Sequence, residues 1–176
     1  MKIPVDEIRE VPQTVAYVEP AEALNRELAR GAAEYQVLDG IAVEVTHHRA
    51  GLDVFIEGMV HGECRGICAR CLEQFHFPLD SALTLVLVPK STMNAPGGVV
   101  REEEIGLASY DGDEIDLTPL IEEQALLALP TRPLCSEGCR GLCPRCGTNL
   151  NAGRCDCPAP AADGRLAVLH TMLRAS

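Results

Sequence analysis

The sequence contains no tryptophan, and aromatic residues make up only 3% of its 176 residues. Basic residues are also scarce, with 15 lysines and arginines against 26 aspartates and glutamates, which gives a formal net charge of −11. A protein that binds nucleic acid over its whole surface must neutralise phosphates with basic side chains. The charge therefore excludes general DNA or RNA binding by the whole surface.

Long apolar segments are missing as well. No apolar run reaches the roughly 20 residues that a membrane-spanning helix requires, since the longest strand-like run, 82–88, is interrupted by Thr84. The first residues lack the charged and apolar regions of a secretory signal peptide. We therefore expect a cytoplasmic protein with no membrane partner.

From Val37 to Val88 apolar residues alternate with polar ones, which predicts strands with one buried face. The alternating sets are Ile41, Val43 and Val45; Leu52, Val54 and Ile56; and Leu83, Leu85 and Leu87, with a turn at 48–51 after the first set. Two helices are predicted, one over 20–31 and one that starts with Thr118 as its N-cap and is buried all round in its second half, 125–129. The predicted fold class is α+β: an antiparallel β-sheet with a few helices and a C-terminal cysteine-rich zinc module.

The positions of the cysteine-rich run and of the Pro/Ala linker predict that the chain has three parts. Residues 1–134 form the α+β domain with the antiparallel sheet, residues 135–158 form a cysteine-rich zinc-binding segment, and residues 159–176 form a C-terminal helix after a Pro/Ala linker. Residues 89–106 are predicted to be a loop. Its acidic continuation, 101–116, is a candidate partner surface, although simple solubility explains the charge better.

Cysteine is in excess, with nine residues of which eight fall in close pairs. A reducing cytoplasm argues against disulfides, so the pairs indicate metal binding. The strongest signal is a C-P-x-C-G turn followed by a C-x-C pair, which together supply Cys143, Cys146, Cys155 and Cys157. Four thiolates from two such turns form the tetrahedron that structural zinc accepts.

A second set is predicted from Cys68 and Cys71, which connect two predicted strands, together with Cys135 and Cys139. These four thiols would clip the sheet to the segment after the buried helix, so the cofactor is one or two structural zinc ions. Two alternatives stay open. The first pair could be a redox couple, or Cys135 or Cys139 could join Cys143 and Cys146 and leave the last pair spare.

Cys64 is left over and is interpreted as a small, half-buried residue. None of the five histidines falls in a metal-enzyme spacing, and His76 is interpreted as a solvent-facing strand residue. A catalytic zinc keeps an open position, normally with histidine or carboxylate ligands. We therefore predict no catalytic residues and no small-molecule substrate.

The basic residues of the cysteine-rich segment form a local excess. Residues 132–157 carry four arginines (Arg132, Arg140, Arg145 and Arg154) against Glu137 and Asp156. A zinc ion held by four thiolates carries a net charge of about −2, which cancels this excess. The arginines could contact individual phosphates, or they could pair with nearby carboxylates.

Several stretches resemble the YceD family. They are Cys68–Glu73, the run 113–117 that leads into 122–130, the cysteine-rich run 139–151, and 165–169, which is similar to the closing helix of that family. The family is described as required for accumulation of large-subunit (23S) ribosomal RNA in bacteria and plastids. The resemblance implies a role in ribosome biogenesis and implies no reaction.

These observations together predict a non-enzymatic factor that promotes accumulation or processing of 23S ribosomal RNA, stabilised by structural zinc. An acidic protein suits a basic partner, such as a ribosomal protein or an rRNA-processing factor; direct contact with 23S rRNA is a further option. The alternative is a zinc–thiolate redox sensor or interaction module that regulates ribosome production. In that case Cys64, next to Arg65, is the point of attack.

Overall fold

The structure, a computed structural model, describes residues 1–90 and 107–158. Its elements are β1 (Lys2–Pro4), the 3-10 helix η1 (Val5–Glu7), β2 (Gln13–Glu19), α1 (Ala21–Gly31), β3 (Tyr35–Ala50), β4 (Asp53–Ile67), β5 (Gln74–Pro89), β6 (Leu107–Tyr110), β7 (Glu114–Asp116) and α3 (Thr118–Ala128). The predicted helix over 159–176 and most of the predicted loop over 89–106 lie outside the described residues. None of the described helices is long and apolar enough to cross a membrane.

The predicted α+β class with an antiparallel sheet is confirmed. Strands β2, β3, β4 and β5 pair in that order and antiparallel, while β6 adds to β5 in parallel. A separate antiparallel pair joins β1 to β7. The predicted acidic surface 101–116 is thus partly in strands, since β6 and β7 take up much of its second half.

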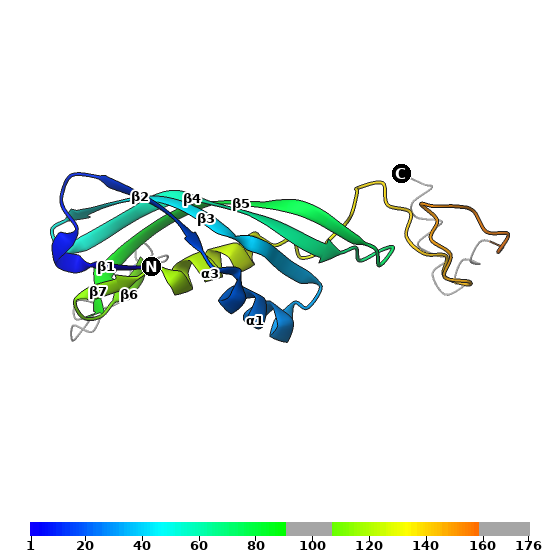
Figure 1. Cartoon of the computed structure of the whole chain (residues 1–176), viewed down its shortest axis with the longest axis horizontal. Coiled ribbons are helices and arrows are strands. Elements are labelled where there is room, and N and C mark those ends of the chain that lie inside the picture. The colour runs from blue at the N-terminus through cyan, green and yellow to red at the C-terminus, as the bar shows by residue number, and fades with distance from the viewer. Residues whose placement is uncertain (91–106, 159–176) are drawn as a thin grey trace, which may run out of the picture.

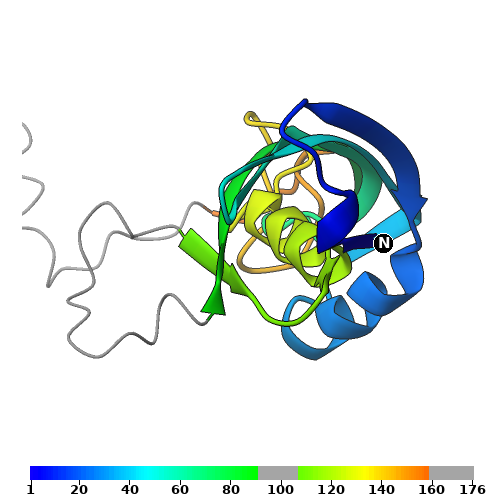
Figure 2. The same ribbon diagram turned by 90° about the vertical axis from the view of Figure 1, so that its left-hand side faces the viewer.

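The core lies on the concave face of the sheet. Figure 2 shows the curved sheet wrapping around α3, with α1 beside it. The buried positions of the three long strands include Val43, Val45, Ile56, Val60, Leu83 and Leu87. Helix α1 adds Leu24 and Leu28, and α3 adds Ile121 and Ala125. Burial of each large aliphatic side chain stabilises the fold by about 1.5–3 kcal/mol, which explains why the strict alternation predicted these strands.

The second half of α3 is not buried all round, so that prediction was wrong. Only one face of the helix packs on the sheet, and Leu126 and Leu127 are 38% and 72% exposed. The helix also begins differently, because the Asp116 side chain accepts the hydrogen bond from the Thr118 N–H at 3.0 Å. Thr118 is therefore the first helical residue rather than the N-cap.

The turn between β3 and β4 is tighter than predicted. Strand β3 continues to Ala50, and β4 resumes at Asp53, so Gly51 and Leu52 alone make the turn. Leu52 is consequently 62% exposed instead of facing the core. The turn is short because the hydrogen-bonded ladder of β3 and β4 continues as far as the pair Ala50 and Asp53. The alternation of apolar residues does not extend that far along the two strands.

The long hairpin of β4 and β5 carries the chain to one end of an elongated molecule (Figure 1). The segment that follows α3 returns to the same end. The Tyr35 hydroxyl at the start of β3 donates to the Pro130 carbonyl oxygen. In the connection between β4 and β5, the Ala69 N–H donates to the Pro133 carbonyl oxygen at 2.9 Å. Two segments distant in sequence thereby bring their cysteines together.

Candidate metal centres

Eight cysteines gather in two clusters at this end of the molecule. The near cluster contains Cys68, Cys71, Cys135 and Cys139, and the far cluster contains Cys143, Cys146, Cys155 and Cys157; in each, the four sulfur atoms lie within 4.8 Å of one another. Both clusters could hold a metal ion. The structure thus brings together the two sets that the spacing predicted, and not the alternative set in which Cys135 or Cys139 joins Cys143 and Cys146.

The sulfur separations in the near cluster fit a tetrahedral ion. The distance from Cys68 Sγ to Cys139 Sγ is 3.7 Å, and the distance from Cys71 Sγ to Cys135 Sγ is also 3.7 Å. A zinc–sulfur distance of about 2.3 Å gives tetrahedral edges of about 3.8 Å, whereas a disulfide requires about 2.05 Å. The donor set and its spacing therefore suit zinc, and no disulfide is formed in the described chain.

The two C-x-x-C turns have the same backbone hydrogen bonds. In the near turn the Leu72 N–H donates to the Cys68 carbonyl and the Cys68 N–H to the Glu73 carbonyl, both at 2.9 Å. In the far turn the equivalent bonds run from Gly147 to Cys143 at 2.9 Å and from Cys143 to Thr148 at 2.8 Å. Each cluster thus starts from a closed turn that directs both sulfurs of its pair to one side.

The residue after each second cysteine has a left-handed backbone. Its φ is 61° at Leu72 and 73° at Gly147. Glycine adopts this conformation freely, whereas an L-residue with a side chain pays about 1–2 kcal/mol. The near turn therefore contains a strained leucine where the far turn has the favoured glycine.

We expect Leu72→Gly to stabilise the protein by about 0.5–1 kcal/mol, because the strain is relieved and only part of the gain is lost to the greater freedom of glycine in the unfolded chain. Leu72 is 64% exposed, so little apolar burial is lost. Urea denaturation measures the change. Gly147→Leu is the matched control with the opposite expected sign, and an unchanged or lower midpoint for Leu72→Gly would contradict the strain.

Arg70 and Gly141 join the two clusters. The Arg70 guanidinium donates to the carbonyl oxygens of Glu137 and Cys139 at 3.0 and 2.9 Å, and the Arg70 carbonyl accepts the Leu142 N–H at 3.1 Å. Gly141 has a φ of 72°, and a Cβ there would lie 3.0 Å from the Arg70 carbonyl oxygen. Only glycine suits both conditions, so the far segment lies directly against the near turn.

Two asparagines complete this contact. The Asn151 side-chain amide donates to Cys139 Sγ at 3.3 Å, and the Asn149 amide donates to a Glu73 carboxylate oxygen at 3.4 Å. No role in this contact was predicted from the sequence for these asparagines, for Arg70 or for Gly141. The positive charge inside a C-x-x-C pair was the signal that could have found Arg70.

Hydrogen bonds lower the pKa of selected thiols. Burial opposes ionisation of Cys68, but backbone N–H groups, first that of Cys135, outweigh it and lower its pKa to about 6. Thr148 lowers the pKa of Cys146 to about 6 through its hydroxyl and its N–H. Desolvation and the neighbouring sulfurs raise the pKa of Cys135 to about 12, and contact with Cys146 raises that of Cys157 to about 12. A divalent cation that binds the clusters would displace the protons of the thiols with raised pKa, so the affinity of the clusters for the cation should rise with pH.

Cys64 belongs to the hydrophobic core and not to either cluster. It is fully buried on β4, and burial, followed by the charge of Glu63, raises the pKa of its thiol to about 11. A buried, protonated thiol reacts slowly, which corrects the expectation of a half-buried residue and removes Cys64 as a point of oxidative attack. His76 is exposed as expected, with its Nδ1 3.7 Å from a Glu63 carboxylate oxygen.

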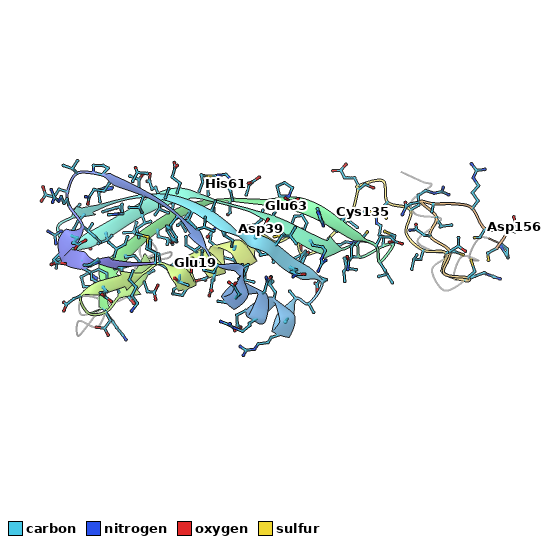
Figure 3. All side chains as sticks on the ribbon, viewed as in Figure 1. Glu19, Asp39, His61, Glu63, Cys135 and Asp156 are labelled. Carbon is cyan, nitrogen blue, oxygen red and sulfur yellow. The ribbon has the colours of Figure 1, made fainter. Side chains whose placement is uncertain are left out.

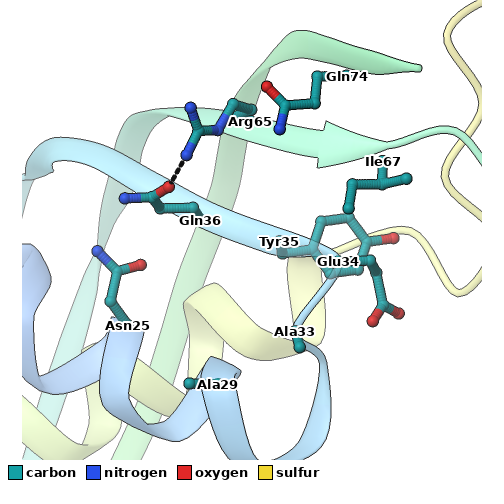
Figure 4. Close-up of a pocket in the computed structure, with 9 residues that line it drawn as sticks. All are labelled: Asn25, Ala29, Ala33, Glu34, Tyr35, Gln36, Arg65, Ile67 and Gln74. Carbon is teal, nitrogen blue, oxygen red and sulfur yellow. Dashed lines mark hydrogen bonds between the residues drawn. The ribbon is translucent and has the colours of Figure 1, made fainter. Parts of the chain in front are cut away.

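A shallow pocket lies beside the near cluster, between the end of α1 and strands β3, β4 and β5 (Figure 4). Its volume is about 270 Å³, and Gln36, Arg65 and Gln74 give it a polar lining. The Arg65 guanidinium donates to the Gln36 side-chain oxygen. Pockets for small molecules are usually larger, about 300–1,000 Å³, and mostly apolar, so this pocket is a weaker candidate site than the clusters.

Comparison with known proteins places this arrangement in a family. A family model described as large ribosomal RNA subunit accumulation protein YceD matches residues 56–173. An uncharacterized protein of Mycobacterium tuberculosis is 37% identical over 98 residues, which cover 55% of this chain and 45% of that protein. An uncharacterized protein of Mycobacterium leprae is 34% identical over 99 residues, which cover 56% of this chain and 43% of that protein.

A plant protein from Arabidopsis thaliana, named large ribosomal RNA subunit accumulation protein YCED homolog 1, chloroplastic, is 39% identical over 44 residues, or 25% of this chain and 14% of that protein. The chain spans less than half the length of the mycobacterial relatives. No solved structure matches it. Because the family model matches more than half of the chain and includes all eight clustered cysteines, the chain belongs to the YceD family.

Proposed function

We propose that this chain is a non-enzymatic, cytoplasmic factor that supports accumulation or processing of 23S ribosomal RNA, and with it the formation of the large ribosomal subunit. The observation that carries the proposal is its membership in a family whose model is described by that role. The name of the Arabidopsis relative has the same wording. The sulfur clusters support a structural rather than a catalytic centre, because four thiolates complete a zinc coordination sphere and leave no position for a substrate.

Zinc is the metal that we propose for both clusters. The near ion would be held by Cys68, Cys71, Cys135 and Cys139, and the far ion by Cys143, Cys146, Cys155 and Cys157. Four soft thiolates in a tetrahedron favour zinc over magnesium or calcium, which prefer oxygen ligands. The near ion would fasten the domain over residues 1–134 to the cysteine-rich segment over residues 135–158.

The outer face of the sheet is the proposed surface for a basic protein, such as a ribosomal protein or an rRNA-processing factor. Glu44, Glu57, Glu63 and Asp80 are exposed there, because their strand neighbours Val43, Ile56, Cys64 and Leu79 face the core. A surface with one dominant sign of charge accelerates association with an oppositely charged partner and disfavours partners of like charge. Figure 3 shows Glu63 and His61 on this part of the molecule.

The test measures the ratio of 23S to 16S rRNA in a strain depleted of this protein and supplied with variants. Neutralising the outer face with Glu44→Gln, Glu57→Gln and Glu63→Gln should lower the ratio by about twofold or more, because the attraction for the basic partner is lost. The control neutralises Glu7, Glu22 and Glu123, which are exposed elsewhere, with an equal change in net charge.

Two results would count against the proposal, and they can be separated. A normal ratio in the depleted strain would remove the role in rRNA accumulation itself. A normal ratio in the strain with the sheet variant, when depletion alone lowers it, would leave the role intact and exclude the outer face as its partner surface.

A further inference from the structure

Three exposed arginines lie at the cysteine-rich end of the molecule. Arg140, Arg145 and Arg154 each adjoin a cysteine of one of the clusters. Residues 138–155 contain these three arginines and no aspartate or glutamate, in a chain that otherwise has a large acidic excess. Apart from the cysteines, the charged side chains of this run are therefore all cationic, and each zinc ion held by four thiolates would place a charge of about −2 beside them.

The guanidinium groups of these arginines are free to bind a ligand. Within residues 1–90 and 107–158, none of the three takes part in an ion pair or a side-chain hydrogen bond. Other arginines are engaged: Arg30 contacts Glu27 at 2.6 Å, and Arg70 donates to two carbonyl oxygens. The three arginines thus retain their full capacity to donate hydrogen bonds.

Their backbones are held in place by the clusters. The Arg140 N–H donates to the Asn151 side-chain oxygen at 2.7 Å, and Arg145 lies inside the hydrogen-bonded far turn. Arg154 precedes Cys155, whose sulfur is part of the far cluster. A ligand that binds these side chains does not have to order a loop, which lowers the entropic cost of binding.

The composition of this surface favours a polyanion over an acidic protein. Protein interfaces have an apolar centre with buried anchor residues. None of the large apolar side chains that are exposed in the described chain falls between 138 and 155. All three cations are arginines, whose planar fork binds phosphate oxygens in pairs. This chemistry suits a phosphate backbone.

We infer that Arg140, Arg145 and Arg154 bind the phosphate backbone of RNA without reading its bases. The inference rests on the proposed function, because that role supplies ribosomal RNA as the polyanion. The acidic outer face of the sheet prevents RNA from covering the whole protein, so the contact is confined to the arginine end. In Figure 3 Asp156, which directly follows the run 138–155, lies far from His61 and Glu63 on the sheet.

The test uses the full chain loaded with zinc and a fluorescein-labelled single-stranded RNA of 20 mixed nucleotides. Three phosphate contacts predict a salt slope of about −2, so the affinity should fall about 20-fold between 50 and 200 mM salt. The variant Arg140→Gln, Arg145→Gln and Arg154→Gln should bind at least about tenfold more weakly at 50 mM salt, with a slope near zero. The control Arg26→Gln, Arg30→Gln and Arg9→Gln changes exposed arginines on other elements.

Zinc content and circular dichroism of each variant show whether the clusters are intact. Equal RNA binding by the triple variant and the parent, or no RNA binding by the parent at 50 mM salt, would overturn the inference. Binding of a labelled acidic peptide in preference to the RNA would also overturn it and would mark a protein site. RNA binding by the purified protein is measured independently of the 23S to 16S ratio in the strain with the sheet variant. Failure of this inference can therefore be distinguished from failure of the proposed function.

Discussion

Cys68→Ser should reduce the zinc content from two ions to one per chain and lower the melting temperature by about 10 °C. The near cluster joins the β4–β5 connection to a segment about 60 residues later, and a cross-link that closes such a loop contributes about 4 kcal/mol. For a domain of this size each kcal/mol corresponds to about 2–4 °C. Elemental analysis and differential scanning calorimetry measure the two effects.

Cys157→Ser is the matched variant in the far cluster. It should also remove one ion, but that cluster closes a loop within residues 143–157 that contains no part of the sheet, so the melting temperature of the sheet should fall by no more than about 3 °C. If both variants retained two ions, or if their melting temperatures were equal, the near cluster would not be the connection between sheet and cysteine-rich segment. EDTA, which removes both ions, should lower the melting temperature of the parent protein by at least the larger of the two shifts.

Gly58→Ala should destabilise the protein by about 3 kcal/mol or prevent folding. Gly58 lies on β4 opposite Val45 of the paired strand β3, and a Cβ there would be 2.1 Å from the Glu44 carbonyl oxygen and 2.8 Å from the Val45 Cα. Both of these atoms belong to the backbone of β3, so β3 and β4 would have to move apart. Overpacking that requires backbone shifts costs about 1–3 kcal/mol or more. Urea denaturation gives the free energy of unfolding.

Gly62→Ala is the control for this prediction. It lies four residues further along the same strand, and its Cβ would meet the Gly40 carbonyl oxygen at 3.3 Å and Ile41 Cγ1 at 3.7 Å. A shift of a few tenths of an ångström accommodates it, so we expect a loss below about 1 kcal/mol. Similar losses in both variants would show that the close approach of β3 to β4 at Gly58 is not maintained in solution.

The sequence predicted the long strands because burial of one face imposes a period of two. The alternation identified Val43 and Val45 on β3 and Leu83 and Leu87 on β5 as core residues. It could not predict β6 or the pairing of β1 with β7, since three- and four-residue strands acquire their conformation from distant partners. It also misassigned Leu127, because an apolar sequence does not reveal that only one face of α3 meets the sheet.

The clusters followed from sequence more readily than the contacts between them. Close spacing already confines Cys143 and Cys146 to one turn, so the far cluster could be predicted from neighbouring residues alone. The pairing of Cys68 and Cys71 with a segment after α3 was inferred only because four sulfurs needed partners. The roles of Arg70 and Gly141 depend on the approach of that segment to the near turn, which no local pattern records.

The β4–β5 hairpin also sets the distance between the two ends of the molecule. Its strands have 15 and 16 residues and pair without interruption from Val54 to Ile67. At about 3.3 Å per residue, this paired region is roughly 45 Å long. Two residues added to each strand would lengthen the hairpin by about 7 Å and keep every side chain on its own face of the sheet. A single added residue would move the side chains beyond it to the opposite face. Relatives with longer or shorter hairpins would hold whatever binds the two ends at correspondingly different spans.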